Sequence, residues 1–199
     1  MKYSRALPVC FLLIASWLSA CAPFTRKDVN PPLTTIQHQL YGVKNWKLEG
    51  RIAVKAGLEG WNANLSWAHE DRQDRLLISG PFSQGAVSII VQADLVYINE
   101  GNGVVSSSRE PDELLKSKLG FSVPLHSLRY WVLGLPDPDV EYQTTVDTAN
   151  GPNGFAQQTW KLVFENYEKL GDYFMPHKIT VQGNGVRLKL VVDDWLLTK

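Results

Sequence analysis

Cysteine is nearly absent from this chain, and its two cysteines, Cys10 and Cys21, both lie close to the N-terminus. Beyond residue 21 there is therefore no thiol for a disulfide bond or a cysteine-ligated metal. Charge of one sign is not in excess either, because 20 Lys and Arg stand against 20 Asp and Glu. This balance argues against a basic surface that binds nucleic acid. After residue 20, no apolar run reaches the length of roughly 20 residues that a membrane-spanning helix needs.

Motifs of catalysis and metal binding are also missing. The histidines have no spacing such as His-Glu-x-x-His and are expected to be surface residues or internally hydrogen-bonded ones. They are His38, His69, His126 and His177. The segment 80–85 places Ser83 between glycines, but it has one residue too many for a nucleophile elbow and joins two predicted strands. We therefore predict neither an enzyme nor a metal site.

Asp193 and Asp194 are the remaining candidate for acid–base chemistry, as an adjacent pair of carboxylates in a predicted strand. Neighbouring residues of a regular strand point to opposite faces of the sheet. We therefore expect the two carboxylates to lie on different faces, where they cannot act on one substrate.

The first 21 residues have the layout of a cleavable secretory signal. A positively charged start precedes an almost uncharged apolar run over residues 9–18, and the small residues Ser19 and Ala20 lead to Cys21. This run is too short to span a membrane. A small-residue site that ends in cysteine is similar to the lipobox of bacterial lipoprotein precursors, which implies that Cys21 is acylated and becomes the mature N-terminus. The alternative is an ordinary signal peptide in which Cys21 is incidental.

Three segments follow from this layout. Residues 1–20 are predicted to be a signal peptide that is removed, residues 21–33 a lipidated, proline-rich flexible tether, and residues 34–199 a single domain. Several acyl chains on one cysteine would give stable anchoring. In lipoprotein families, Asp directly after the acylated cysteine commonly retains the protein at the inner membrane. Position 22 is Ala, so the resemblance implies a lipid-anchored protein on the periplasmic face of the outer membrane.

Alternation of apolar and polar residues predicts strands from residue 46 onward. In 46–56, the side chains of Leu48, Ile52 and Val54 share one face and charged residues occupy the other, which is typical of a strand with one wet face. In the next strand, over 61–67, one face is entirely apolar. That face consists of Trp61, Ala63, Leu65 and Trp67.

The rest of the domain continues this pattern, interrupted by two helices. Further strands are predicted at 76–79, 87–93, 95–99, 104–107, 140–148, 155–167, 177–182 and 186–195. One helix is predicted before the strands, at 36–43, and two helices are inserted between them, at 111–119 and 124–132. Strands and helices do not alternate, so a parallel sheet is not expected. We predict a mainly β fold: one curled antiparallel sheet of nine to eleven strands forms an incomplete, half-open β-barrel. The inserted helices would form a lid over its apolar concave face, enclosing a hydrophobic cavity.

An ordered set of short stretches resembles one family, the outer-membrane lipoprotein receptor LolB. The set covers the whole mature chain and comprises the Cys21 lipobox, Gly50-Arg51, Trp67, Gly80-Pro81-Phe82, residues 128–136, Trp160 and Trp195. The family fold is an incomplete antiparallel β-barrel with a hydrophobic cavity under helices, which agrees with the prediction above. The resemblance implies a receptor that accepts client lipoproteins from the periplasmic carrier LolA and inserts them into the lipid of the outer membrane. We expect a monomer with no cofactor apart from the lipid on Cys21.

The acyl chains of a client are expected to bind in this cavity. Aromatic side chains offer broad contact with few rotamers to freeze, so we predict a wall made of Leu65, Trp67, Trp131, Trp160 and Trp195. The alternative for any of these tryptophans is that it fills a dry core. Two other functions remain open: a lipoprotein that binds another apolar ligand such as free lipid, and an assembly or scaffold lipoprotein that docks a partner.

Phe82 is the candidate for membrane insertion. It follows Pro81 in a glycine-bounded turn, where an exposed large apolar side chain is costly unless something apolar receives it. In the resembled family, the corresponding loop carries a protruding leucine linked to membrane insertion. Here Phe82 keeps the apolar character, while Ser83 stands where the family usually has glycine. The alternative is that Phe82 folds back as a plug of the core.

Overall fold

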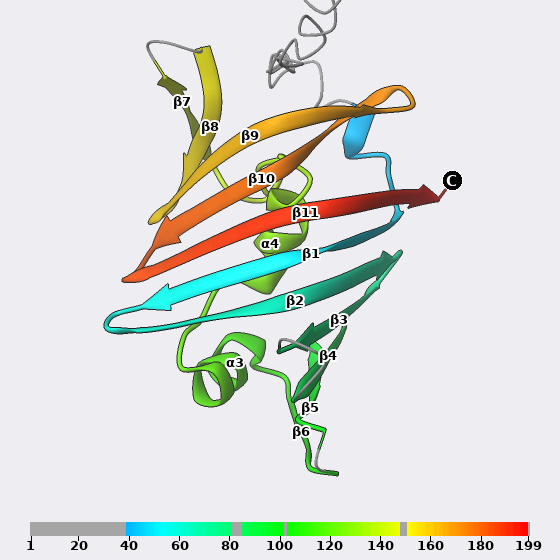
Figure 1. Ribbon diagram of the computed structural model, residues 1–199, viewed down its shortest axis with the longest axis vertical. Coiled ribbons are helices and arrows are strands. Elements are labelled where there is room, and N and C mark those ends of the chain that lie inside the picture. Colours follow the sequence, from blue (N-terminus) through cyan, green and yellow to red (C-terminus); the bar gives the residue numbers. More distant parts are fainter. Residues whose placement is uncertain (1–38, 81–84, 102, 148–150, 199) are drawn as a thin grey trace, which may run out of the picture.

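The computed structural model describes residues 39–80, 85–101, 103–147 and 151–198. Its strands are β1 (Asn45–Ala56), β2 (Glu59–Glu70), β3 (Gln73–Ser79), β4 (Ala86–Gln92), β5 (Leu95–Asn99), β6 (Val105–Ser108), β7 (Tyr142–Asp147), β8 (Gly151–Gln157), β9 (Trp160–Leu170), β10 (Tyr173–Gly183) and β11 (Val186–Thr198). They form a single antiparallel sheet in the order β6-β5-β4-β3-β2-β1-β11-β10-β9-β8-β7 (Figure 1). Only β1 and β11 are neighbours that do not follow each other in sequence.

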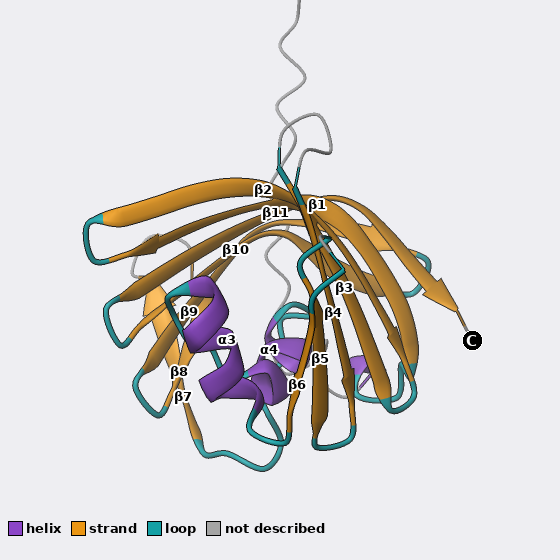
Figure 2. Cartoon of the chain, turned by 90° about the horizontal axis from the view of Figure 1, so that it is seen from below, coloured by secondary structure: helices purple, strands orange, loops and turns teal. Residues whose placement is uncertain are grey.

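The sheet curls strongly but does not close, since β6 and β7 form its two free edges. Figure 2 shows the sheet arching over two helices, α3 (Pro111–Leu119) and α4 (Leu125–Trp131), which lie inside the curl. Buried and exposed residues alternate along β1 as a one-sided strand requires. The predicted mainly β fold, an open antiparallel sheet with helices against its concave face, is therefore confirmed.

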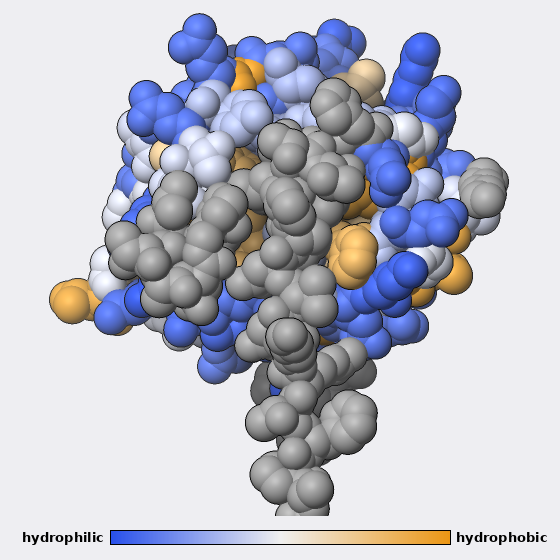
Figure 3. Space-filling model, turned by 90° about the horizontal axis from the view of Figure 1, so that it is seen from above, coloured by the Kyte–Doolittle hydropathy of each residue, from blue (hydrophilic) through white to orange (hydrophobic). Residues whose placement is uncertain are grey.

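Seen from above, the molecule carries mainly hydrophilic side chains around the rim of this view, with hydrophobic ones as separate spots (Figure 3). No helix within the described ranges is long and apolar enough to cross a bilayer.

A bulge in the β1–β11 ladder changes which residues of β11 face outward. The register shifts between Glu49 and Gly50, which pair with Asp194 and Val192 and leave Asp193 as the extra residue. Gly50 is needed here, because a Cβ atom at this position would lie 2.4 Å from the Val191 carbonyl oxygen. Both aspartates are consequently exposed on the same wet face, so the expectation that they point to opposite faces is wrong.

The segment 155–167, which the sequence predicts to be one strand, consists of the end of β8 and most of β9, so this prediction is wrong. A tight turn at Gln158 and Thr159 separates them, and Gln158 adopts a positive φ of 50°. No glycine or proline marks this turn, so the sequence pattern runs through it. Of the predicted helix at 36–43, residues 36–38 lie outside the described residues. Gln39 and Leu40 are helical, but the chain turns at Tyr41 and Gly42, so the helix ends earlier than predicted.

Both inserted helices begin and end close to where the sequence predicts them. Pro111 occupies the first turn of α3, where its missing N–H costs nothing. Gly120 ends that helix with a left-handed φ of 80°, and its N–H donates to the Lys116 carbonyl oxygen at 3.0 Å.

Candidate functional site: a hydrophobic cavity under two helices

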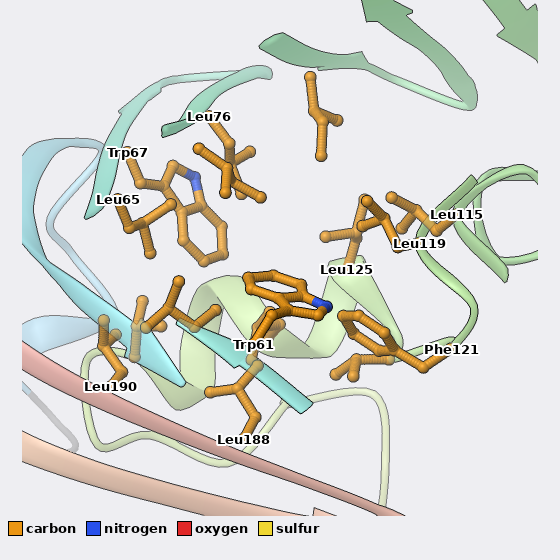
Figure 4. A pocket seen from close by; sticks show the side chains of 16 residues that line it. Trp61, Leu65, Trp67, Leu76, Leu115, Leu119, Phe121, Leu125, Leu188 and Leu190 are labelled. Atoms are coloured by element: carbon orange, nitrogen blue, oxygen red, sulfur yellow. The ribbon is translucent and has the colours of Figure 1, made fainter. Parts of the chain in front are cut away.

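An entirely apolar cavity lies between the concave face of the sheet and the two helices (Figure 4). Its free volume is about 50 Å³, which is room for only a few water molecules. Sixteen side chains line it: Ile52, Trp61, Leu65, Trp67, Leu76, Ile78, Ile89, Leu115, Leu119, Phe121, Val123, Leu125, Leu128, Val132, Leu188 and Leu190.

The floor of the cavity comes from alternate residues of neighbouring strands. Trp61, Leu65 and Trp67 share the inward face of β2, and Leu76 and Ile78 continue that face in β3. This is the period-two pattern that the sequence shows for 61–67.

The roof is formed by α3, the segment after it and α4. Leu115 and Leu119 project from α3, and Leu125 begins α4 (Figure 4). The ring of Phe121, in the connection between the helices, lies with its centroid 6.0 Å from that of Trp61. The roof therefore meets the floor through apolar contacts alone at this point.

A buried polar network borders the cavity at Trp67. The carboxylate of Asp74, which is only 2% exposed, accepts a hydrogen bond from the Trp67 indole Nε1 at 3.0 Å, and the His69 ring Nδ1 lies 2.8 Å from the same oxygen. The Arg129 guanidinium is 2.9 Å from the other carboxylate oxygen. Since Arg129 belongs to α4 and Asp74 to β3, this network fixes both the cavity wall and the helix that covers it.

Gln157 supplies a second fixed point for the end of α4. Its side-chain oxygen accepts hydrogen bonds from the Trp131 Nε1 at 2.7 Å and the Asp137 N–H at 2.9 Å. Its amide nitrogen donates to the carbonyl oxygens of Asp137 and Val140 at 2.9 and 2.8 Å. All of the hydrogen-bonding capacity of this buried side chain is thereby used to hold the segment after α4 against the end of β8.

The attachment of α3 is of a different kind. Leu115 is its one fully buried side chain, and Leu114 and Leu119 are partly buried. Its ion pair joins Lys118 to Glu100 at 3.2 Å, with both side chains about 30% exposed. Nothing comparable to the Asp74 or Gln157 contacts ties α3 to the sheet among the described residues.

The structure divides the predicted wall residues into two groups. Leu65 and Trp67 line the cavity, whereas Trp131, Trp160 and Trp195 are buried elsewhere. Trp131 packs on Trp160 at 6.0 Å between ring centroids and bonds to Gln157. Trp195 lies 5.9 Å from Trp46 and donates its Nε1 hydrogen to the Pro176 carbonyl oxygen at 3.1 Å.

Several lining residues are absent from the sequence-based prediction of the wall. Trp61 carries a usable signal, since it shares the face of Leu65 and Trp67 on β2. The lining residues of α3 and α4 belong to helices that the sequence predicts, but the sequence does not show which part of the sheet these helices cover. Cys21 and Phe82 lie outside the described residues.

Two further titratable features do not line the cavity. Burial raises the pKa of Tyr167 well above its ordinary value.

The ligand atoms of His126, Asp137 and Asp139 lie within 4.8 Å of one another, a spacing that could hold a cation. However, Asp137 already accepts hydrogen bonds from the Ser127 hydroxyl at 2.6 Å and the Asp139 N–H at 3.1 Å. His126 and Asp139 are largely exposed, so this cluster serves first to order the segment after α4.

Known proteins match this chain over nearly its whole length. A family model described as "Outer membrane lipoprotein LolB" matches residues 44–195. A protein of Nitrosococcus oceani named outer-membrane lipoprotein LolB is 29% identical over 202 residues, covering 99% of this chain and 100% of its own. A protein of the same name from Pseudomonas fluorescens is 28% identical, and the match covers 92% of each chain.

Among solved structures, the fold is similar to that of a LolA superfamily protein from Nitrosomonas europaea. The TM-score is 0.52 at 9% identity, and the match covers 85% of this chain and 95% of the other. At this identity the likeness concerns the fold alone.

Proposed function

Since the chain belongs to the LolB family of outer-membrane lipoproteins, we propose that its cavity receives the acyl chains of other lipoproteins. The family assigns the protein to the outer membrane and to lipoprotein localisation. The finer steps that we propose are acceptance of a client from the periplasmic carrier LolA and insertion of that client into the outer membrane.

The observation that carries this proposal is the chemistry of the cavity. All sixteen lining side chains are apolar, so the cavity offers no partner for a polar substrate and no group for catalysis. An acyl chain suits such a surface, because each CH₂ group removed from water contributes about 0.8 kcal/mol. Several chains cannot cross the periplasm unaided against that cost.

The volume of the cavity implies that the roof moves. Pockets that enclose small ligands typically measure about 300–1,000 Å³, whereas the free volume here is about 50 Å³. An acyl chain therefore requires displacement of part of the wall. The helix held mainly by apolar contacts is α3, and those contacts can be exchanged for contacts with an acyl chain at little net cost. We propose that α3 is the mobile part of the roof.

Transfer would follow a gradient of affinity from carrier to receptor to bilayer. The receptor must bind the chains more tightly than the carrier and less tightly than the membrane. Two further parts of the proposal concern residues outside the described ranges: an acyl anchor on Cys21, and insertion of Phe82 into the membrane.

A handover assay tests the proposal. Purified LolA loaded with an acylated client is mixed with this protein without nucleotide, and the client bound to each is measured. We expect acceptance by the parent and its loss in Leu119→Glu, which places a carboxylate in the roof. Leu77→Glu is the matched control, because Leu77 is 46% exposed on the β3 strand.

Three results would decide against the receptor. Acceptance by folded Leu119→Glu at the parent rate would remove the cavity from the mechanism. Uptake of free phospholipid without uptake of a client would instead indicate a lipid-binding module. Normal outer-membrane assembly by a variant that accepts neither would indicate a scaffold.

A further inference from the structure

A second hollow lies on the outer face of the sheet, at the end where β1 turns into β2. It measures about 400 Å³ and is bordered by Lys55, Arg187 and Lys189, together with Leu58 at the tip of the turn. Glu59 is the one acidic residue on its border. In Figure 1 this is the end of the sheet opposite the C-terminus. The hollow thus combines three cations with one carboxylate and one apolar tip.

The register of the strands makes this grouping of cations costly. Lys55 pairs directly with Arg187 across β1 and β11, and the same row continues through Gln182 to Lys161 on β9. Like charges directly opposite each other destabilise a sheet. Among the described residues, none of the four cations in and beside the hollow, Lys55, Lys161, Arg187 and Lys189, forms an ion pair with a carboxylate.

Two other cations of the sheet have an acidic partner. Arg51 pairs with Asp193 at 2.7 Å, and Lys178 pairs with Glu165 at 2.8 Å. Folding alone therefore does not explain an uncompensated basic end on a chain whose total charge is balanced. An anionic partner would relieve the repulsion.

Leu58 adds an independent observation. Its side chain is fully exposed, and Gly57 beside it has a positive φ of 60° that shapes the turn. An exposed apolar side chain beside a group of cations suits a bilayer interface, where the cations meet anionic headgroups and the apolar side chain enters the acyl boundary.

We propose that this end of the sheet, defined by Lys55, Leu58, Arg187 and Lys189, docks onto anionic phospholipid headgroups of the membrane. The inference rests on the proposed function only in that the protein works at a membrane surface. Docking would turn the domain so that this end faces the bilayer. It would be a second contact, additional to any lipid anchor.

The length of the chain before the domain favours a membrane over an acidic protein as the occupant. The chain from residue 21 to residue 38 can extend to roughly 60 Å, which exceeds the roughly 40 Å length of a strand such as β1. An anchor at Cys21 can therefore reach the same membrane.

A fluorescent probe at the tip tests the docking. The full mature protein, with its lipid, is placed in nanodiscs of phosphatidylcholine alone or with phosphatidylglycerol, and Leu58→Cys is labelled with an environment-sensitive dye. The parent is the labelling blank, because its mature chain has no cysteine besides Cys21. Leu196→Cys is the matched control, since Leu196 is exposed near the other end of β11.

We expect a blue shift at position 58 only on discs with phosphatidylglycerol, reversed by high salt, and no shift at position 196. Each cation near an anionic surface raises affinity roughly fivefold. The triple variant Lys55→Gln, Arg187→Gln and Lys189→Gln should therefore reduce the docked-to-undocked ratio about a hundredfold.

Equal emission on both kinds of disc would overturn the inference, and so would a blue shift that survives the triple variant. A shift that LolA causes on uncharged discs, and that is absent on anionic discs, would also overturn it, because the hollow would then bind a protein partner. The handover assay on the same samples separates the two proposals. Normal handover without a shift overturns the docking alone, whereas a shift without handover overturns the receptor function alone.

Discussion

The two helices inside the curl cover the same cavity but are attached to the sheet by different forces. The helix α4 is fixed by two buried polar contacts in its last turn, through Arg129 to Asp74 and through Trp131 to Gln157. By contrast, α3 rests on the sheet through apolar side chains and one partly exposed ion pair.

This difference matters because the two kinds of contact respond differently to an apolar ligand. Buried polar groups lose their partners when a helix leaves, and each unmade hydrogen bond costs about 1–3 kcal/mol. Apolar side chains lose little if an acyl chain takes the place of their former neighbours. The cavity therefore has one fixed wall and one replaceable roof.

The largest expected effect comes from removing the buried carboxylate that fixes α4. Asp74→Ala leaves the Arg129 charge unpaired in a largely buried site, together with the Trp67 indole N–H. We expect a loss of about 3–5 kcal/mol in unfolding free energy, measured by urea denaturation. The control Asp94→Ala breaks the exposed pair with Arg109 and should cost less than about 1 kcal/mol.

A double variant sharpens this test. Asp74→Leu combined with Arg129→Met removes both charges, so its loss should be clearly smaller than the sum of the two single losses. Additive losses would show that the pair does not hold α4.

The next effect concerns Gln157. Gln157→Leu leaves the Trp131 and Asp137 N–H groups and two carbonyl oxygens without their partner. We expect a loss of about 2–4 kcal/mol, accompanied by faster amide exchange in the segment after α4. Gln92→Ala on the exposed end of β4 should change neither. Unchanged exchange after α4 in Gln157→Leu would contradict the role given to this side chain.

Tyr41 gives a smaller effect that depends on pH. Its hydroxyl donates to the Pro136 carbonyl oxygen at 2.7 Å, and burial is the main cause that raises its pKa from 10.0 to about 12. Between these values the unfolded chain loses the proton while the folded chain keeps it, so stability falls as pH rises through this window. Tyr41→Phe should lose about 0.5–1.5 kcal/mol at neutral pH and show a shallower fall from pH 10 upward. A fall identical to that of the parent would exclude Tyr41 as a source.

The smallest effect is expected on the α3 side. Lys118→Gln removes the ion pair with Glu100 and should cost no more than about 1 kcal/mol in global stability. Amide exchange within α3 should nevertheless become faster, while α4 is unaffected. A large global loss would show that α3 is fixed in the same way as α4 and would erase the distinction between the helices.

Local patterns predicted the fold and one part of the cavity. The period-two alternation of β2 gave the correct inward face, including Leu65 and Trp67, and Pro111 and Gly120 marked the ends of α3. These signals are local, since they depend on residues that are neighbours in one element.

What the sequence did not reveal depends on contacts between distant segments. The bulge at Asp193 results from its pairing with Gly50 on another strand, and the β8–β9 turn has no glycine or proline. Trp131 is directed away from the cavity by Gln157, which lies 26 residues later in the chain. Hydrophobicity predicts that a tryptophan side chain is buried, but the position of its hydrogen-bond partner determines where in the fold it is buried.

The most direct test of the central claim, that acyl chains replace α3 against the cavity wall, is photo-cross-linking with a client lipoprotein whose acyl chain carries a photoreactive group. After handover from LolA, the modified residues are mapped by mass spectrometry. The account predicts adducts on floor residues such as Trp61 and Ile78, inside the cavity. Adducts confined to the outer face of the sheet, with none on the lining residues, would contradict it.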